Sequence, residues 1–280
     1  MPSVSAEIAK ALIRALPIYN GKGRIVDSSF LSRYQFPEEL IDITTSDGFE
    51  MRVNPNDLVG RILYFTGRFD RCVVDAIAHF SEDGDCLWDI GANIGYVSCA
   101  FLCRFPNAHA LSVEPLPDIA KILRHNVEDV GAGRSVVLEA AVSNTNGTSS
   151  IVRVPGNSGA SHVVADGTGQ SILLADGRAL LDIAPPPDVI KIDVEGHEIP
   201  VLEGIYDVIV TNRPKVIVFE HHTKGMPVDC RVTELFDNAG YDVRNIWRRV
   251  DGWTLGPINT APTKRYEPST DFAATPKIKG

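Results

Sequence analysis

A glycine-rich stretch between an apolar run and a helical pattern is the first place where this sequence could do chemistry. It reads Trp88-Asp89-Ile90-Gly91-Ala92-Asn93-Ile94-Gly95-Tyr96. Glycines at a strand-to-helix turn let the backbone approach a ligand closely, and the start of a helix offers N–H groups without partners. We therefore expect a nucleotide-type ligand at this loop.

The spacing of the glycines argues against a dinucleotide. The pyrophosphate fingerprint is GxGxxG, and Asn93 stands where its middle glycine lies beside the pyrophosphate. Asp89, next to the loop, suits a cationic ligand with an amino group. Glu114 ends the next predicted strand, 23 residues after Gly91, where doubly wound folds place a carboxylate for ribose hydroxyls. A lone GxxxG is also typical of close helix packing, but with both carboxylates the pattern favours S-adenosylmethionine.

A second polar stretch, residues 188–198, carries a predicted strand that ends in carboxylates. Ligands of doubly wound sheets bind at the carboxyl ends of strands, so Asp193 and Glu195 are expected to face the same crevice as the glycine loop. Glu195 and Glu198 have a structural alternative, because acidic side chains favour the first turn of a helix and can cap it.

The strand that follows also ends in a polar cluster, Glu220-His221-His222. With Asp193 and Glu195, these side chains could hold a general base for a hydroxyl or oxygen ligands for Mg²⁺. Adjacent residues of a strand point to opposite faces, which argues against His221 and His222 binding one ion. We assign no metal site.

These motifs resemble the FkbM family of S-adenosylmethionine-dependent methyltransferases over about residues 56–225. The resemblance rests on the glycine loop, Glu114-Pro115, Asn126, and the acidic motif 190–198 followed by Val201-Leu202-Glu203-Gly204. The KIDxEGxE part is specific, since other methyltransferases share the glycine loop but not this stretch. Family members often carry Tyr-Glu before the sheet, where this chain has Phe69-Asp70, which leaves the role of that shorter carboxylate open.

The resemblance implies an α/β fold of the class I methyltransferase type, Rossmann-like, with a doubly wound, mostly parallel seven-stranded sheet. It implies O-methylation of a hydroxyl on a sugar, glycolipid precursor or secondary metabolite. It also implies cofactor contacts, with Glu114 at the ribose. The residues expected to bind S-adenosylmethionine are Asp89, Gly91, Ala92, Asn93, Gly95, Glu114, Pro115, Ala141 and Asp193.

Methyl transfer is an in-line displacement at a carbon that the sulfonium already activates, so the enzyme mainly aligns the reactants and excludes water. A sugar hydroxyl is a poor nucleophile while protonated, and a positioned general base contributes about 10²–10⁴-fold. We nominate His197 first, because an unperturbed histidine with a pKa of ~6.5 suits proton removal near neutral pH. Asp193 is second, and Glu220 or His221 third. The alternative for His197 is a solvent-exposed helix residue.

Helical and strand patterns alternate from residue 70, which predicts a parallel sheet with helices on both faces. The expected strands are residues 86–90, 109–113, 135–142, 189–193, 216–220 and 241–246. The expected helices are residues 70–80, with Asp70 as a cap, 94–104 and 118–130, and two more around 197–205 and 232–238.

The segments outside this alternation divide the chain. Residues 1–55 are expected to form an appendage, residues 56–250 the methyltransferase domain and residues 251–280 a proline-bearing C-terminal tail. The appendage has a hairpin around Asp47-Gly48 and an amphipathic helix over residues 5–16. That helix either packs through Ile8, Leu12, Ala15 and Leu16 or binds a partner.

Residues 143–188 break the pattern and are interpreted as a loop-rich insertion that includes a hairpin through Ile151 to Val154. Its glycine-flanked pair Ser161-His162 could close over the acceptor as a lid. Expected acceptor contacts are therefore His162, Glu195 and His221.

Composition limits the function further. The 280 residues include 27 basic and 36 acidic ones, a formal charge of −9, which argues against binding nucleic acid through its phosphates. No apolar run approaches the roughly 20 residues of a membrane span. Five cysteines without a CxxC pair suit a reducing, cytoplasmic compartment.

We therefore expect a cytoplasmic O-methyltransferase that uses S-adenosylmethionine and a small-molecule or glycan acceptor. One alternative is a nicotinamide-dependent oxidoreductase, which Asn93 opposes. The other is a non-catalytic module that keeps the cofactor pocket, which the intact acidic motif opposes.

Overall fold

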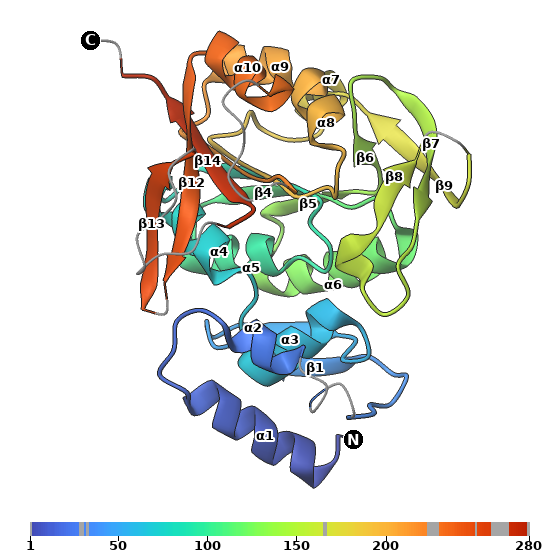
Figure 1. Cartoon of the computed structure of the whole chain (residues 1–280). Coiled ribbons are helices and arrows are strands. Elements are labelled where there is room, and N and C mark those ends of the chain that lie inside the picture. Colours follow the sequence, from blue (N-terminus) through green and yellow to red (C-terminus); the bar gives the residue numbers. More distant parts are fainter. Residues whose placement is uncertain are drawn as a thin grey trace.

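The central sheet is built from strands that bury side chains on both faces. Every residue of Cys86–Ile90 is buried, and Leu87 packs into the core on one face while Trp88 packs into the core on the other. Val189 and Ile190 divide between the same two cores. Two-sided burial explains the continuous apolar runs of these strands and the helical layers that cover both faces (Figure 1).

The structure is a computed structural model that describes residues 2–27, 31, 34–164, 167–222, 230–249, 251–258 and 269–278. The strands are β1 (Ile41–Thr44), β2 (Glu50–Val53), β3 (Cys86–Ile90), β4 (His109–Val113), β5 (Ser135–Leu138), β6 (Ala141–Val142), β7 (Gly147–Val152), β8 (His162–Val164), β9 (Gln170–Ala175), β10 (Val189–Ile192), β11 (Val216–Glu220), β12 (Tyr241–Arg249), β13 (Gly252–Pro257) and β14 (Asp271–Pro276). The helices are α1 (Val4–Ala15), α2 (Lys22–Val26), α3 (Leu58–Thr66), α4 (Arg71–Phe80), α5 (Tyr96–Arg104), α6 (Pro117–Gly131), α7 (Gly177–Leu181), α8 (Glu198–Gly204), α9 (Tyr206–Asn212) and α10 (Arg231–Asn238), with a 3₁₀ turn η2 (Ser158–Ala160).

The strand order places a topological switch point at the middle of the large sheet. Within the described residues this sheet has eight strands in the order β13-β12-β14-β11-β10-β3-β4-β5. Strands β11, β10, β3, β4 and β5 run parallel, and β14 lies antiparallel between β11 and β12. The chain moves outward from β3 to β5 and returns on the other side of β3 with β10 and β11. Doubly wound folds bind ligands at this position, and the predicted fold class is confirmed.

The C-terminal segment 251–280 is not the tail that we expected. It contributes β13 and β14 to the large sheet, and with the six strands that we predicted they make the eight strands of the described sheet, where the resemblance implied seven. The centre of β14, residues 272–274, is fully buried. Of the four prolines that suggested a tail, Pro257 and Pro276 stand at strand ends, where a missing N–H removes little from the ladder, and Pro262 and Pro268 lie outside the described residues. Residues 259–268 of this segment lie outside the described residues.

Helices α4, α5 and α6 cover one face of the sheet, and α7, α8, α9 and α10 lie on the other (Figure 1). Asp70 precedes α4 with a φ of +40°, and its side chain makes no hydrogen bond to the helix. The prediction that this carboxylate caps α4 is therefore wrong. The side chain instead lines the cavity at the end of the sheet.

The N-terminal segment lies beyond the α4–α6 layer, and one buried side chain fixes its hairpin there (Figure 1). Strands β1 and β2 pair around Asp47-Gly48, as predicted. Asn126 of α6 accepts a hydrogen bond from Arg52 N at 2.7 Å and donates to Arg52 O at 3.1 Å and Ile94 O at 2.8 Å. Asn126 therefore ties β2 to the glycine-rich loop.

Helix α1 turns inward a different face from the one that we expected. Ala6 and Ile13 are buried, whereas Ile8 and Leu12 are 57% and 65% exposed. The small Ala6 side chain lets α1 approach α3 closely, and Arg14 donates to carbonyl groups at the end of α3. The amphipathic helix exists, but apart from Ile13 its large apolar side chains, Val4, Ile8 and Leu12, face outward.

Residues 143–188 contribute a small second sheet rather than a loop-rich insertion. Its described strands follow the order β6-β9-β7-β8, with Ile151 and Ile172 buried beneath β7 and β9. Because β6 pairs with β9, the predicted strand 135–142 divides into β5 and β6. Serines, threonine and glycine in β7 hid the alternation of this sheet from sequence reasoning.

Candidate active site

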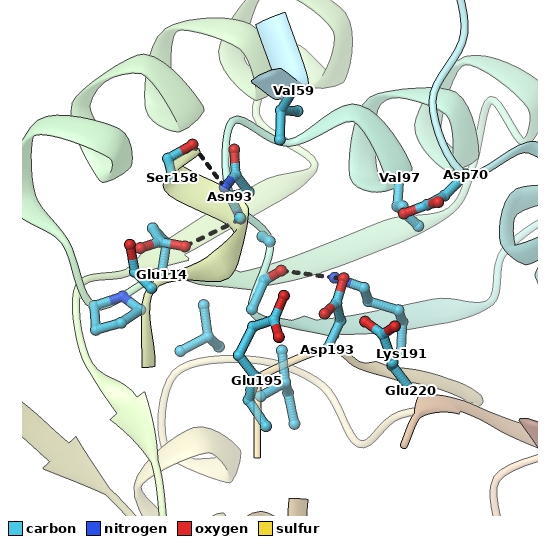
Figure 2. A pocket seen from close by; sticks show the side chains of 18 of the residues that line it. Val59, Asp70, Asn93, Val97, Glu114, Ser158, Lys191, Asp193, Glu195 and Glu220 are labelled. Atoms are coloured by element: carbon cyan, nitrogen blue, oxygen red, sulfur yellow. Dashed lines mark hydrogen bonds and ion pairs between the residues drawn. The ribbon is translucent and has the colours of Figure 1, made fainter. Parts of the chain in front are cut away.

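The carboxyl ends of β3, β4, β10 and β11 surround a cavity of about 300 Å³ at the switch point (Figure 2). Its walls come from the glycine-rich loop, the acidic motif, the second sheet, α3 and the start of β14. The lining residues are Leu58, Val59, Phe69, Asp70, 90–94, Tyr96, Val97, 113–115, 140–142, Ile151, 157–159, Ser161, Val163, Lys191, 193–195, His197, Glu220, Arg248, Thr270 and Asp271.

The glycine-rich loop requires glycine for steric reasons. Gly91 has a φ of +78°, and a Cβ added to it would lie 1.8 Å from the carbonyl oxygen of Asp193. A Cβ on Gly95, with a φ of +89°, would lie 2.6 Å from Leu123 Cδ1. The backbone N–H groups of Gly91 and Ala92 both donate to Val113 O at 2.9 Å. The loop is thus pressed against β4 and β10.

Glu114 is a buried carboxylate fixed by backbone donors. Its Oε2 accepts from Asn93 N at 3.1 Å and its Oε1 from Leu116 N at 3.0 Å. Burial raises the pKa of Glu114 to about 7, against the lowering effect of the two donors. A carboxylate offers about four acceptor positions, so about two remain for ligand hydroxyls.

The loop around Ser158 lies on the glycine-rich loop. Asn93 Nδ2 donates to Ser158 Oγ at 3.2 Å, as Figure 2 shows. Ser158 N and Oγ also donate to the carboxylate of Asp57, at 2.6 and 3.0 Å. The second sheet, the start of α3 and the cofactor loop are therefore joined. Of the pair predicted to close over the acceptor, Ser161 lines the cavity. His162, at the start of β8, does not line it.

Lys191 connects the glycine-rich loop to the acidic motif. Its Nζ donates to Gly91 O at 2.6 Å and lies 3.2 Å from Asp89 Oδ1 and 3.5 Å from Asp193 Oδ2. Burial lowers the pKa of Lys191, but the carboxylates of Asp89 and Asp193 raise it by more, above the ordinary value. Asp89 is fully buried and lies outside the cavity lining, so the structure places it behind the pocket wall.

Three carboxylates form a cluster on the pocket wall. Oxygen atoms of Asp193, Glu195 and Glu220 lie within 4.8 Å of one another, and Figure 2 shows them beside Lys191. Burial and then the charge of Asp193 raise the pKa of Glu220 to about 8, and burial raises the pKa of Glu195. Thr270 Oγ1 donates to Glu220 Oε1 at 2.7 Å. We call these three residues the carboxylate cluster.

Two of the predicted histidines do not join this cluster. His197 lines the cavity, but its Nε2 lies 3.2 Å from Ser143 Oγ, and burial lowers its pKa. It is half-buried rather than solvent-exposed. His221 lies outside the lining, with its backbone N–H donating to Thr270 O at 2.8 Å. Glu198 lies in the first turn of α8 and is buried, and its Oε1 accepts from Gly196 N, just before the helix, at 2.8 Å.

Sequence reasoning missed four polar residues of the cavity wall. Lys191 carried a usable signal, because a lysine inside a buried strand needs a buried acidic partner. Thr270 and Asp271 stand in the segment that we took for a tail. Arg248, at the end of β12, lines the cavity and forms an ion pair with Asp271.

This fold and this site define a class I S-adenosylmethionine-dependent methyltransferase. The model of the FkbM methyltransferase domain matches residues 89–243, and the chain belongs to that family. The hexuronic acid methyltransferase AglP of Haloferax volcanii is 30% identical over 174 residues, which cover 61% of this chain and 70% of that protein. The methyl donor is S-adenosylmethionine, and the oxidoreductase and non-catalytic alternatives are set aside.

Two solved methyltransferases are similar to this chain at low sequence identity. The FkbM methyltransferase of Methylobacillus flagellatus KT is 14% identical with a TM-score of 0.44, over 76% of this chain and 52% of that chain. M. jannaschii TYW2, solved with AdoMet, is 10% identical with a TM-score of 0.48, over 88% and 90%. In the described part of this chain, no helix combines the length and the apolar character that a bilayer crossing requires.

Proposed function

We propose that this protein transfers the methyl group of S-adenosylmethionine to a hydroxyl of a sugar acceptor. The carboxylate cluster, on the other side of the cavity from Glu114, carries the proposal (Figure 2). A hydroxyl must lose its proton during transfer and needs a base. An acceptor carboxylate would arrive ionised, would need no base and would be repelled by the cluster. The similarity to a hexuronic acid methyltransferase supports a sugar as the acceptor.

The cavity residues fit S-adenosylmethionine. The backbone at Gly91 leaves no room for a Cβ, Glu114 offers acceptor positions for ribose hydroxyls, and small apolar side chains at 140–142 line the same cavity. Asp193 supplies negative charge for the amino or sulfonium group. When bound, S-adenosylmethionine supplies a methyl group on a positively charged sulfur. Asp89 does not line the cavity and contributes indirectly, through its ion pair with Lys191.

We assign the general base to the pair Asp193 and Glu220. Glu220 accepts the proton of the acceptor hydroxyl while the hydroxyl oxygen takes the methyl group. Its raised pKa of about 8 suits this role, because a base is most effective when its pKa lies near the operating pH. Thr270 orients Glu220, and Lys191 stabilises the negative charge of Asp193. Glu195 then borders the acceptor.

The test compares Glu220→Gln with the wild type. We expect kcat to fall about 10²–10⁴-fold, the usual contribution of a general base, while calorimetric affinity for S-adenosylhomocysteine stays within about twofold. Glu128→Gln, an exposed carboxylate change on α6, is the matched control and should leave both quantities unchanged. Wild-type turnover in Glu220→Gln would remove Glu220 from the mechanism.

A further inference from the structure

A second cavity, of about 650 Å³, adjoins the first and has strongly basic walls. It lies between the N-terminal segment, the start of α4 and the end of β12. Within the described residues its lining includes seven basic side chains, Arg14, Lys22, Arg24, Arg68, Arg71, Arg248 and Arg249, and one acidic side chain, Asp70. The whole chain has a formal charge of −9, so this concentration of positive charge departs from the average surface. We call it the cationic cavity.

The two cavities share a boundary. Phe69, Asp70 and Arg248 line both. These three side chains therefore form the wall between the cationic cavity and the cavity that holds the carboxylate cluster. Asp70 stands at this junction.

Two of these cations, Arg14 and Lys22, are held in place without a carboxylate partner in the described part of the chain. Among the described residues, neither Arg14 nor Lys22 has a carboxylate oxygen within 4.0 Å, and Lys22 Nζ donates to Arg14 O at 3.0 Å. Burial, and then repulsion from Arg68, Arg71 and Arg14, lowers the pKa of Lys22. Arg71 stacks on the Tyr19 ring at 3.6 Å, with Asp75 at 3.6 Å on its Nε. The cations repel one another, and an anion between them would relieve that repulsion.

Buried guanidinium donors point to the same kind of ligand. Within the residues that the structure describes, the Nε atoms of Arg14, Arg68 and Arg248 are buried and have no hydrogen-bond partner, while the Nη atoms of the same groups make the contacts within the chain. Such donors are costly to leave without a partner, and guanidinium groups match phosphate oxygens in geometry. Four of the seven cations, Arg68, Arg71, Arg248 and Arg249, each have a carboxylate partner, Asp47, Asp75, Asp271 and Asp251. Arg14 and Lys22 add positive charge beyond these pairs, which suits a phosphate or diphosphate because it carries two or more negative charges.

We propose that the cationic cavity binds the phosphate or diphosphate of a phosphorylated sugar acceptor, whose sugar ring extends past Asp70 to the carboxylate cluster. This inference rests on the proposed sugar O-methylation. It makes the N-terminal segment part of the acceptor site, since α2 and the chain before it supply Tyr19, Lys22 and Arg24. The phosphate end of the acceptor then lies among these basic residues, and the sugar hydroxyl at its other end receives the methyl group.

The first arm of the test measures binding without turnover. Inorganic pyrophosphate is titrated calorimetrically into wild type, Lys22→Gln/Arg71→Gln and the control Arg178→Gln, which removes an exposed cation on α7. We expect the double variant to weaken pyrophosphate binding about tenfold or more, because charge-assisted hydrogen bonds are lost. Affinity for S-adenosylhomocysteine should not change, and thermal melting confirms that each variant folds. If the double variant is unstable, the two single variants replace it. Equal pyrophosphate affinity in wild type and variants overturns the proposal.

The second arm separates this proposal from the proposed function. Methyl transfer is measured with glucuronic acid, glucuronic acid 1-phosphate and a nucleotide diphosphate sugar of the same acid. We expect the KM of the phosphorylated acceptors to rise about tenfold in the double variant, with kcat and the KM of glucuronic acid unchanged. The phosphorylated acceptor with the lower KM shows whether the cationic cavity binds a monophosphate or a diphosphate. Equal changes for free and phosphorylated acid contradict the phosphate site, whereas no transfer to any sugar, with pyrophosphate binding intact, contradicts only the proposed function.

Discussion

Lys191 and Asp89 stand side by side on β10 and β3, with their Cα atoms in register and Lys191 Nζ 3.2 Å from Asp89 Oδ1. Their side chains are only 6% and 0% exposed. Asp89 Oδ2 also accepts from Ser98 Oγ at 2.7 Å, which fixes the carboxylate. This buried pair holds the glycine-rich loop, through Gly91 O, against the acidic motif. The cofactor loop and the carboxylate cluster therefore depend on one lysine.

Lys191→Met should destabilise the protein strongly. Removing one partner of a buried ion pair leaves the other charge uncompensated, so we expect the free energy of unfolding to fall by about 3–5 kcal/mol. Urea denaturation at neutral pH measures this. Lys121→Met, an exposed change on α6, should stay within about 0.5 kcal/mol. Adding Asp89→Asn to Lys191→Met should recover part of the loss. A loss below about 1 kcal/mol for Lys191→Met would contradict the role of this pair.

Gly91→Ala should abolish cofactor binding. The new Cβ would lie 1.8 Å from Asp193 O, so the loop and β10 must separate. Gly84→Ala is the matched control, because Gly84 also has a positive φ, +100°, but nothing within 4 Å of an added Cβ. The control pays only backbone strain, about 1–2 kcal/mol of stability. Calorimetry should show that S-adenosylhomocysteine binds to Gly84→Ala and does not bind to Gly91→Ala. Equal affinities of the two variants would contradict the steric role of Gly91.

The sequence predicted the elements that position the site better than those that enclose it. Strands β3, β4 and β11 coincide with their predicted ranges, because a strand buried on both faces is a continuous apolar run. The second sheet escaped prediction because its strands are short and partly polar. The segment around β14 was missed because its prolines outweighed a short apolar run. Long-range pairing, which no local pattern encodes, brings Thr270 to Glu220.

Activity should rise with pH through the titration of Glu220. Its pKa of about 8 lies above the ordinary value of 4.5, so the group is mostly protonated at pH 6 and cannot accept the hydroxyl proton. We expect kcat/KM to increase about tenfold per pH unit below 8 and to level off above it. Glu220→Gln should lose this dependence along with most of the rate. A profile that is flat between pH 6 and 9 in the wild type would contradict the assignment.

His197→Ala should retain turnover. His197 contacts Ser143, and it stands apart from the carboxylate cluster. Because burial lowers its pKa, the imidazole is neutral at neutral pH and adds no charge to the pocket. We expect kcat to fall less than about fivefold, well short of the about 10²-fold loss of a general base. A 10²-fold loss in kcat with unchanged cofactor affinity would restore His197 as the base.

Metal chelation should leave the rate unchanged. Asp193, Glu195 and Glu220 have the oxygen atoms that Mg²⁺ prefers. However, Lys191 already compensates Asp193, and the raised pKa of Glu220 leaves a proton in the cluster. We expect equal kcat values after dialysis against EDTA and after addition of Mg²⁺. A loss on dialysis that Mg²⁺ restores would turn the cluster into a metal site.

The transfer of a ¹³C-labelled methyl group from S-adenosylmethionine to a uronic acid is the most direct test of sugar O-methylation, with the product identified by NMR. We expect a methyl ether on a ring hydroxyl, formed by wild-type protein and lost in Glu220→Gln. A methyl ester on the carboxyl group, formed equally well by Glu220→Gln, would contradict both the hydroxyl acceptor and the carboxylate base.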